Sequence, residues 1–415
     1  MSTLSSLLPP IAQPRLEIGD PMPELDWINQ RNEPVSLYTD TTCGRATVLL
    51  ICRSTISIAG QIAELRDSFD RFKPFDAQVF VVSTDMPAIN QAAVQAMELP
   101  FDVLYDPTLS AGRGFGLEQS GAMTGGGTVG MGAMGMGAQG MATMGGVMPA
   151  MATRPWCAVV LNPNVRILHA VTPEAGKSAA AGALEFLAAY PSPGREEILV
   201  SHAPVLIIPK VLEPDLCARL VELHQTGDQY EGGLTNVQDG DYVIRREIKT
   251  RQDIGVPDGD AEAQRIYANF RKRVFPEIFK AFRYRVTRAE TMRVGCYIAS
   301  DGGKFEPHRD DNTPATGHRR FGFTINLNAG EYEGSQLQFP EYGPQLYAPV
   351  TGDMVVFSVS LLHEVMPVTK GRRYGLFGFL FGEEEEARRK QRNPSFDSLN
   401  VDVPSGSHHV GRGTS

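Results

Sequence analysis

The first half of the chain alternates short apolar runs with stretches that have helical periodicity. Residues 47–52 and 77–83 are continuous apolar runs, which are typical of buried strands. Residues 62–72 and 88–97 place apolar side chains at the spacing of an amphipathic helix, and residues 102–105 begin a further strand. Strands that alternate with helices in this way predict an α/β sandwich.

The pattern ends with a hairpin and a helix. Two apolar runs, 157–161 and 166–170, flank the turn sequence Asn162-Pro-Asn164, which predicts a β-hairpin. Residues 174–189 then predict a helix, and the sequence Pro-Ser-Pro-Gly at 191–194 breaks it. We therefore place a domain boundary at this break.

The second half has a different pattern of apolar runs and turn residues. An extended apolar segment at 203–209 precedes a predicted helix at 213–225, and a long helix is predicted over 261–282. Between these helices, residues 228–260 are rich in Gly and Asp and predict an irregular lid or substrate loop. Residues 291–381 form short strands separated by Gly, Pro and Asp turns, which is typical of an antiparallel β sandwich or barrel.

These patterns divide the 415 residues into two domains. We expect an N-terminal arm at 1–14, a first domain at 15–192, a second domain at 195–382 and a flexible tail at 383–415. Within the first domain, residues 121–150 contain 11 of the 42 Gly and 7 of the 15 Met without a single charge. Such a tract gains too little packing to order itself and predicts a flexible insertion.

Composition narrows the possible partners and the compartment. The formal net charge is −9, which argues against nucleic acid or an anionic membrane as a partner. No apolar run approaches the length of a membrane helix, and the N-terminus lacks the pattern of a signal peptide. The cysteines are scattered without a CxxC pair, so we expect no disulfide framework or structural zinc site and a cytoplasmic location. These cysteines are Cys43, Cys52, Cys157, Cys217 and Cys296.

A set of metal-binding side chains lies within the β region. His308 and Asp310 are two residues apart, so in a strand they share one face and can meet one ion. His363, on a distant strand, can complete the 2-His-1-carboxylate arrangement that binds Fe(II) and leaves coordination positions open. Ten residues later, Arg373 lies on the next predicted strand, where a guanidinium can pair with a carboxylate.

Residues from Ala203 to Gly382 resemble the 2-oxoglutarate/Fe(II) dioxygenases, in particular the prolyl 4-hydroxylase-like branch. The resemblance rests on the His308-Arg-Asp310 triplet and on several flanking segments. These segments are PVLIIPKVLEPDLCARLVEL, Cys296-Tyr-Ile, Gly-Ser-Gln-Leu-Gln-Phe at 334–339, Gly352-Asp353 and His363-Glu-Val with the later Gly-Arg-Arg-Tyr. The resemblance implies a double-stranded β-helix (jelly-roll) core with flanking helices.

It also implies roles for individual residues. His308, Asp310 and His363 would ligate Fe(II), and Arg373 would hold the C5 carboxylate of 2-oxoglutarate. Arg372 is the alternative anchor; adjacent strand residues point to opposite faces, so only one can serve. We favour Arg373 because the family's binding residue directly precedes this tyrosine.

Two further positions match the cosubstrate pocket of the family. Tyr297 corresponds to a position that often lines it, and Asn326 stands on a strand where relatives often have a tyrosine. Packing in the core and a polar strand end are the alternatives for Tyr297 and Asn326. We expect His318 to be an exposed loop residue, and His408 and His409 to be solvated.

The implied reaction is the hydroxylation of an unactivated C–H bond with Fe(II), 2-oxoglutarate and O₂, releasing succinate and CO₂. L-Ascorbate, as a reductant that sustains activity, is implied by the resemblance alone. The substrate is either a protein, including its prolyl residues, or a small molecule. The alternative functions are a binding or scaffold protein in which both domains are catalytically degenerate, and a thiol peroxidase or oxidoreductase that acts through the N-terminal domain.

The first domain resembles the peroxiredoxin/thioredoxin-like fold over residues 15–190. The similar segments are LEIGDPMPELDWINQRNEPVSL, the run at 47–52 and the later VFVVSTD. Peroxiredoxins carry a nucleophilic Cys at the first helical turn after that strand, but residues 54–61 contain none. Cys52 comes too early, and Cys43 has no cysteine partner. We therefore expect a scaffold, docking or substrate-presenting domain rather than a thiol peroxidase.

Overall fold

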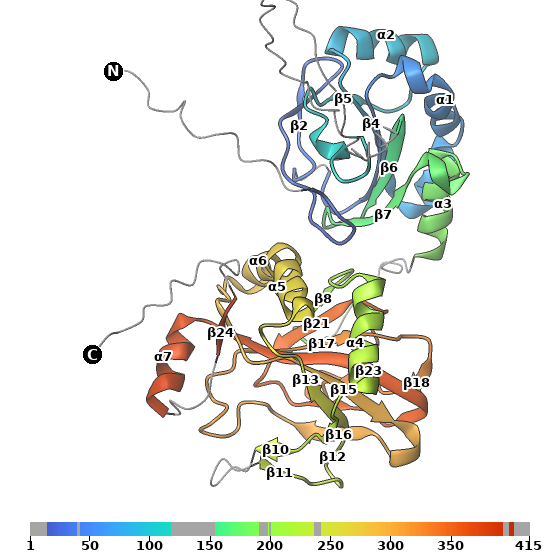
Figure 1. Ribbon diagram of the computed structural model, residues 1–415. Helices are drawn as coiled ribbons and strands as arrows, with labels where there is room; N and C mark the ends of the chain where they lie inside the picture. Colours follow the sequence, from blue (N-terminus) through green and yellow to red (C-terminus); the bar gives the residue numbers. More distant parts are fainter. Residues whose placement is uncertain are drawn as a thin grey trace, which may run out of the picture. The chain divides into compact units, whose positions relative to one another are not determined.

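A computed structural model describes residues 15–39, 42–117, 154–190, 198, 201–235, 242–392 and 398–401 (Figure 1). Several predictions therefore lie outside the described residues. They concern the arm at 1–14, the Gly/Met-rich tract at 121–150, the break at 191–194, and His408 and His409. The chain divides into two compact units, one of residues 1–17 and 22–193 and the other of residues 18–21 and 194–415.

The first unit contains a seven-stranded sheet in the order β2-β1-β5-β4-β3-β6-β7. β3 and β4 pair in parallel, as do β4 and β5, whereas β6 and β7 form an antiparallel hairpin. The strands are β1 (Trp27–Asn29), β2 (Pro34–Val35), β3 (Ala46–Cys52), β4 (Ala77–Ser83), β5 (Val103–Tyr105), β6 (Trp156–Leu161) and β7 (Ile167–Val171).

Both faces of this sheet are buried, which explains its uninterrupted apolar runs. Val48 and Leu50 of β3 pack in one core cluster with helices α1 (Ala59–Asp67) and α3 (Ala179–Ala189). Leu49 and Ile51 point to the opposite face and join a second cluster. With α2 (Pro87–Met97), this is the α/β sandwich of a thioredoxin-like domain.

The second unit contains two larger sheets and a small hairpin. The ten-stranded sheet comprises β8 (Leu206–Ile208), β9 (Tyr230–Glu231), β13 (Gln252–Gly255), β14 (Arg288–Ala289), β15 (Arg293–Ile298), β17 (Phe321–Asn326), β18 (Tyr332–Gly334), β21 (Met354–Ser358), β23 (Val368–Phe381) and β24 (Leu399–Asn400). The five-stranded sheet comprises β12 (Lys249–Thr250), β16 (Lys304–His308), β19 (Leu337–Gln338), β20 (Leu346–Tyr347) and β22 (His363–Val365). β10 (Leu234–Thr235) and β11 (Tyr242–Val243) pair with each other.

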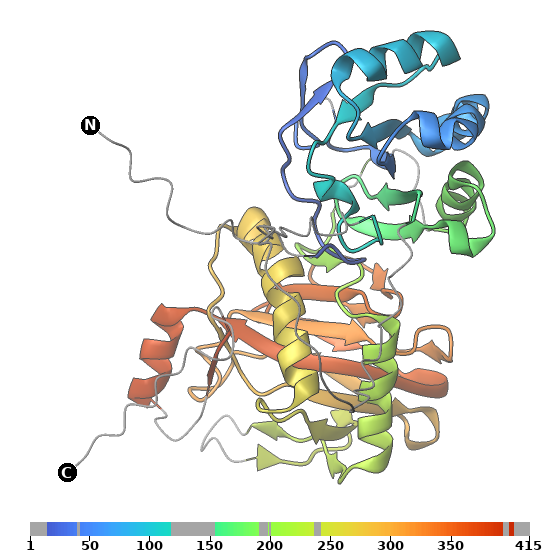
Figure 2. The ribbon, with the colours of Figure 1, turned by 45° about the horizontal axis from the view of Figure 1, so that its top comes forward.

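Alternation along β17 shows how the two faces of the large sheet differ. Phe321, Phe323 and Ile325 belong to the core cluster that includes buried residues of helices α4 (Pro214–Thr226), α5 (Ala261–Arg273) and α6 (Phe275–Phe282). Figure 2 shows α4 and α5 lying across this face of the sheet. Gly322 and Thr324 point to the other face and line a cavity. The result is a jelly roll whose interior is open for a site.

The long helix predicted over 261–282 is two helices. α5 ends at Arg273 and α6 begins at Phe275, with Val274 between them at φ −112°. Pro276 lies in the first turn of α6, where its missing N–H leaves no hydrogen bond unmade. An uninterrupted helix would require that N–H to donate to the preceding turn.

The tail expected to be flexible from residue 383 is ordered in its described part. Residues 383–392 form helix α7 (Glu383–Arg392), and β24 pairs with β14. Glu386 is buried, and its carboxylate accepts hydrogen bonds from the Arg389 guanidinium and the Ser398 hydroxyl. The run of four Glu lies in the first turn of the helix, where the helix dipole favours negative charge.

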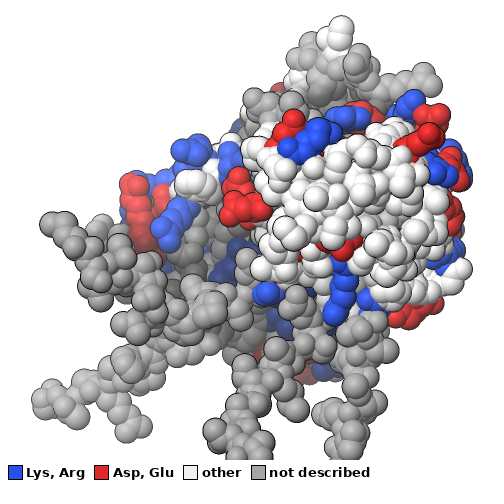
Figure 3. All heavy atoms as spheres, turned by 90° about the horizontal axis from the view of Figure 1, so that it is seen from above, with Lys and Arg blue, Asp and Glu red and all other residues white. Residues whose placement is uncertain are grey.

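The surface seen in Figure 3 carries Lys, Arg, Asp and Glu around a broad area of uncharged residues. The two signs of charge are mixed on this face rather than separated into fields. Within the described ranges, no helix has the length and hydropathy required to cross a membrane.

Candidate active site

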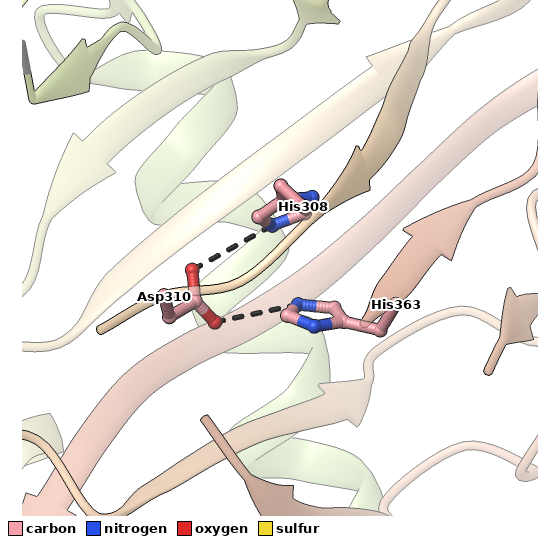
Figure 4. A group of neighbouring side chains, drawn as sticks. All are labelled: His308, Asp310 and His363. Atoms are coloured by element: carbon pink, nitrogen blue, oxygen red, sulfur yellow. Dashed lines mark ion pairs between the residues drawn. The ribbon is translucent and has the colours of Figure 1, made fainter. Parts of the chain in front are cut away.

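Three side chains converge where two inner strands of the five-stranded sheet end and begin (Figure 4). His308 ends β16 and His363 begins β22, and the two residues are direct partners in the antiparallel pairing of these strands. Asp310 follows in the loop after β16. Its Oδ1 lies 3.6 Å from Nε2 of His308 and its Oδ2 lies 3.3 Å from Nε2 of His363. One donor atom from each residue lies within 4.8 Å of the others, which is the spacing of a metal site.

The imidazoles are oriented for ligation by hydrogen bonds on their far sides. Nδ1 of His308 lies 2.8 Å from the carbonyl oxygen of Glu306, and Nδ1 of His363 lies 2.9 Å from that of Leu361. A carbonyl can only accept, so Nδ1 carries a proton, which leaves Nε2, on the Asp310 side, as the atom that would ligate a metal. Two such nitrogens and one carboxylate oxygen fit a divalent transition metal such as Fe(II).

The three groups form one buried electrostatic unit. Burial raises the pKa of Asp310, but the two imidazoles outweigh this effect and hold it well below its usual range. Burial lowers the pKa of His308. Burial also acts to lower the pKa of His363, but Asp310 outweighs this effect and raises it. A metal would require an ionised carboxylate and a free Nε2 on both imidazoles, so its binding would displace the proton that Asp310 favours on His363.

Arg373 carries a buried positive charge that no carboxylate neutralises among the described residues. Its guanidinium donates to the Asn326 side chain (3.0 Å), the Ser335 carbonyl oxygen (3.1 Å) and the Thr324 hydroxyl (3.1 Å). All of these partners are neutral, and Arg373 is only 2% exposed. A buried guanidinium without a counter-ion fits the far carboxylate of a bound dicarboxylate such as 2-oxoglutarate.

Arg372 and Asn326, the two residues next to Arg373, lie in different environments. Arg372 is exposed, because adjacent residues of β23 point to opposite faces. Asn326 is buried behind Arg373, where Oδ1 accepts from the guanidinium and Nδ2 donates to the Pro349 carbonyl oxygen. Asn326 therefore touches the anchor rather than the cavity.

Tyr297 is fully buried and lines the same cavity as the metal-binding triad. It lies directly opposite Arg373 in the pairing of β15 with β23. Its hydroxyl oxygen accepts a hydrogen bond of 3.3 Å from Arg251, which also forms a bidentate pair with Asp253 at 2.5 and 2.7 Å.

The cavity has a volume of about 410 Å³ and brings together residues from both sheets. Its lining also includes six cations that the sequence pattern did not single out, namely Arg245, Lys249, Arg251, Arg293, Arg309 and Arg319. Lys249 and Arg251 come from the segment that the sequence predicts as irregular. The alternation Lys249-x-Arg251-x-Asp253 was a signal for a strand with one charged face.

The prediction that His318 is exposed is wrong. His318 is 5% exposed, with Nε2 3.1 Å from Oε1 of the buried Glu290 and its ring edge-on to Phe381. Arg319 forms a bidentate pair with the same carboxylate at 2.6 and 2.8 Å. A buried carboxylate needs ionic or hydrogen-bonding partners, and His318 and Arg319 provide them for Glu290. The loop that carries these two residues therefore packs against the interior.

In the N-terminal unit, residues 54–61 begin the α1 region without a cysteine. The backbone N–H and hydroxyl of Thr55 donate to the Asp85 carboxylate at 2.7 and 2.8 Å. Cys52 is fully buried in β3, and burial raises the pKa of its thiol. Cys43 is half-buried, with Sγ 3.3 Å from the Leu37 carbonyl oxygen.

Comparison with known proteins assigns each half of the chain. Residues 292–381 match the 2OG-Fe(II) oxygenase superfamily, and residues 18–135 match the AhpC/TSA family. A PKHD-type hydroxylase of Pseudomonas putida strain KT2440 is 27% identical over 214 residues, which cover 48% of this chain and 90% of that protein. A PKHD-type hydroxylase of Saccharophagus degradans is 37% identical over 93 residues, 20% of this chain and 40% of that protein.

Solved structures resemble each half. A prolyl-4-hydroxylase of Pseudomonas putida has 22% identity and a TM-score of 0.34, covering 43% of this chain and 94% of that one. The peroxidoxin BcpB of Mycobacterium tuberculosis has 18% identity and a TM-score of 0.31, covering 43% and 99%. On the sequence matches, this chain contains a C-terminal 2OG-Fe(II) oxygenase domain and an N-terminal AhpC/TSA peroxiredoxin-like domain.

Proposed function

We propose that the C-terminal domain hydroxylates an unactivated C–H bond of a protein, including prolyl residues, or of a small molecule. The observation that carries the proposal is the cavity shared by the His308–Asp310–His363 triad and the uncompensated guanidinium of Arg373. A metal site and an anion site in one cavity are what a metal-bound keto-dicarboxylate requires.

Each residue has a role in this proposal. His308, Asp310 and His363 hold Fe(II), and Arg373 holds the C5 carboxylate of 2-oxoglutarate. When bound, Fe(II) supplies the activation of O₂: one oxygen atom enters succinate as CO₂ leaves, and the other enters the substrate C–H bond. Tyr297 lines the cosubstrate end of the cavity, and Asn326 orients Arg373 from behind.

The chain also protects the reacting centre from water. The ring of Phe305 stacks on His308 with centroids 3.4 Å apart, and the ring of Phe357 lies 4.6 Å from that of His363. These aromatic walls fix the imidazole planes and leave little room for solvent behind the ligands. A dry site strengthens the pairing of Arg373 with a carboxylate.

Succinate formation and metal binding test the proposal. We expect the full-length protein to bind Fe(II) and to convert 2-oxoglutarate to succinate, measured with and without L-ascorbate. His308→Ala and Asp310→Ala should abolish both, whereas His202→Ala, an exposed histidine of the same unit, should change neither. Intact turnover in the ligand variants would refute the assignment.

For the N-terminal domain we infer a non-catalytic role as a scaffold, docking or substrate-presenting module. Residues 54–61 lack the nucleophile, and Cys52 is inaccessible and has a raised thiol pKa. We expect no reduction of hydrogen peroxide beyond the buffer rate in the presence of a thiol reductant. Peroxide reduction that disappears in Cys52→Ser would overturn this inference.

A further inference from the structure

The cavity is strongly positive. Seven Lys and Arg side chains line it, whereas Asp310 is the one acidic side chain among its described lining residues. Asp310 is committed to the metal site. The cosubstrate can neutralise Arg373, so the remaining cations show what else the cavity is built to receive.

Three of the six remaining cations already have a carboxylate partner behind the cavity wall. Arg251 pairs with Asp253, and Arg319 pairs with Glu290. Arg309 forms a bidentate pair with Glu341 at 3.1 and 2.7 Å. A guanidinium that is already paired with a carboxylate attracts a further anion only weakly.

Arg293 has no such partner. It makes no hydrogen bond and no ion pair with any residue in the described part of the chain, although it lines the cavity and is half-buried. In β15 it lies directly opposite Gly255 of β13 and Phe377 of β23, neither of which can accept its protons. Its charge acts on Asp253 and Glu290 only through space, and both carboxylates are held by other cations.

Lys249 and Arg245 also lack a carboxylate of their own among the described residues, but Arg245 is exposed. The Nζ of Lys249 donates to the Gly233 carbonyl oxygen at 3.2 Å and lies 4.0 Å from Asp253, which Arg251 already occupies. Burial, and then Arg251, hold the pKa of Lys249 well below its usual range. Arg293, which stays charged, is therefore the stronger anchor for an anion.

We propose that the substrate carries a carboxylate that binds Arg293 while its reacting C–H bond lies against the His308–Asp310–His363 centre. The proposal rests on the dioxygenase function above. It gives the cavity two anion positions, one at Arg373 for the cosubstrate and one at Arg293 for the substrate. The carboxylate belongs either to a free organic acid or to an Asp or Glu side chain of a peptide.

Calorimetric titration of the full-length protein, loaded with redox-inert Mn(II) and saturated with 2-oxoglutarate, tests the second position. Benzoate and benzamide are the probes, because they differ in charge but hardly in shape. We expect benzoate to bind at least tenfold more tightly than benzamide, and Arg293→Gln to remove this preference. Arg293→Lys should keep part of it, and Arg372→Gln, a matched charge loss outside the cavity, should keep all of it. Equal binding of the two probes, or a preference that survives Arg293→Gln, overturns the proposal.

The affinity for 2-oxoglutarate separates the two anion positions. Arg373→Gln should weaken it at least tenfold, and Arg293→Gln should change it by less than about twofold. Equal losses in the two variants would assign Arg293 to the cosubstrate and overturn the proposal. A wild-type protein that binds no 2-oxoglutarate would instead refute the proposed function.

A cell extract separated by size and by charge distinguishes the two sources of the carboxylate. Each fraction is incubated with the enzyme, Fe(II) and 2-oxoglutarate, and products heavier by one oxygen atom are sought by mass spectrometry. A small carboxylic acid as precursor identifies a free acid, and a peptide with Asp or Glu near the oxidised residue identifies an acidic peptide. A neutral or basic precursor overturns the proposal.

Discussion

The Nε–H of Arg373 donates to Oδ1 of Asn326 at 3.0 Å, between the neighbouring strands β23 and β17. The amide oxygen is neutral, so it orients the guanidinium without consuming its charge. Asn326 also donates to the Pro349 carbonyl oxygen, which fixes the orientation of the amide. The guanidinium that we propose as the cosubstrate anchor is thus held in place by neutral groups.

Asn326→Asp should weaken 2-oxoglutarate binding by at least about tenfold, or roughly 1.4 kcal/mol. The new carboxylate would have nearly the same shape but would neutralise Arg373 from behind. Calorimetric titration of the Mn(II)-loaded protein measures the change, with Arg372→Ala as the exposed control. Unchanged affinity in Asn326→Asp would show that Arg373 does not hold the cosubstrate.

Gly295→Ala should destabilise the C-terminal unit by roughly 3 kcal/mol. A Cβ at this position would lie 2.6 Å from Oδ1 of Asp253 and 2.7 Å from Nε of Arg251, so the buried ion pair would have to separate. Chemical denaturation monitored by far-UV circular dichroism measures the loss in the free energy of unfolding. Gly255→Ala is the matched control, because a Cβ there meets nothing within 4 Å. Equal stability of the two variants would contradict this account of Gly295.

Glu386→Gln should reduce stability at pH 7 by roughly 3 kcal/mol and flatten its dependence on acid pH. Burial raises the pKa of Glu386, but hydrogen bonds from Arg389 and Ser398 outweigh it and lower the pKa to about 2. A depressed carboxyl pKa stabilises the fold above the unfolded pKa, near 4.5, and this contribution is lost as the pH falls toward 2. Unfolding free energies at pH 7 and pH 3 provide the measurement, and Glu384→Gln, on the exposed side of α7, is the control. A tail that is unfolded at pH 7 would make the two variants indistinguishable.

One of the five thiols should react readily with an aromatic disulfide reagent in the native protein. Cys43 is half-buried, whereas the other four cysteines are buried. We expect about one equivalent to react before denaturation and five after it, with the native equivalent missing in Cys43→Ser. Rapid native reaction in Cys43→Ser would reveal an accessible thiol elsewhere and reopen the question of peroxidase chemistry.

The elements that local pattern determines could be predicted from the sequence. The run at 47–52 became β3 because both faces of its sheet are buried, and the run at 77–83 coincides with β4. The helix predicted over 261–282 failed at Val274, because helical periodicity continues across Pro276 while its hydrogen bonding does not. The order in α7 depends on buried ion pairs that its highly charged sequence does not reveal.

Some residues of the candidate site could likewise be predicted from the sequence, and others could not. His308 and His363 are 55 residues apart, yet spacing and strand alternation sufficed to suggest that they meet. The significance of Arg293 was invisible, because 39 Lys and Arg residues look alike until their partners are known. The register of β13, β15 and β23 places Arg293 opposite residues that are not carboxylates. His318 was predicted to be exposed because its polar loop sequence gives no sign of its buried partner Glu290.

The triad lies on the five-stranded sheet, whereas Arg373 lies on the ten-stranded sheet. A dicarboxylate that spans from a metal at the triad to Arg373 therefore crosses the interior of the jelly roll and ties its layers together. Its binding free energy is added to the resistance of this unit to unfolding.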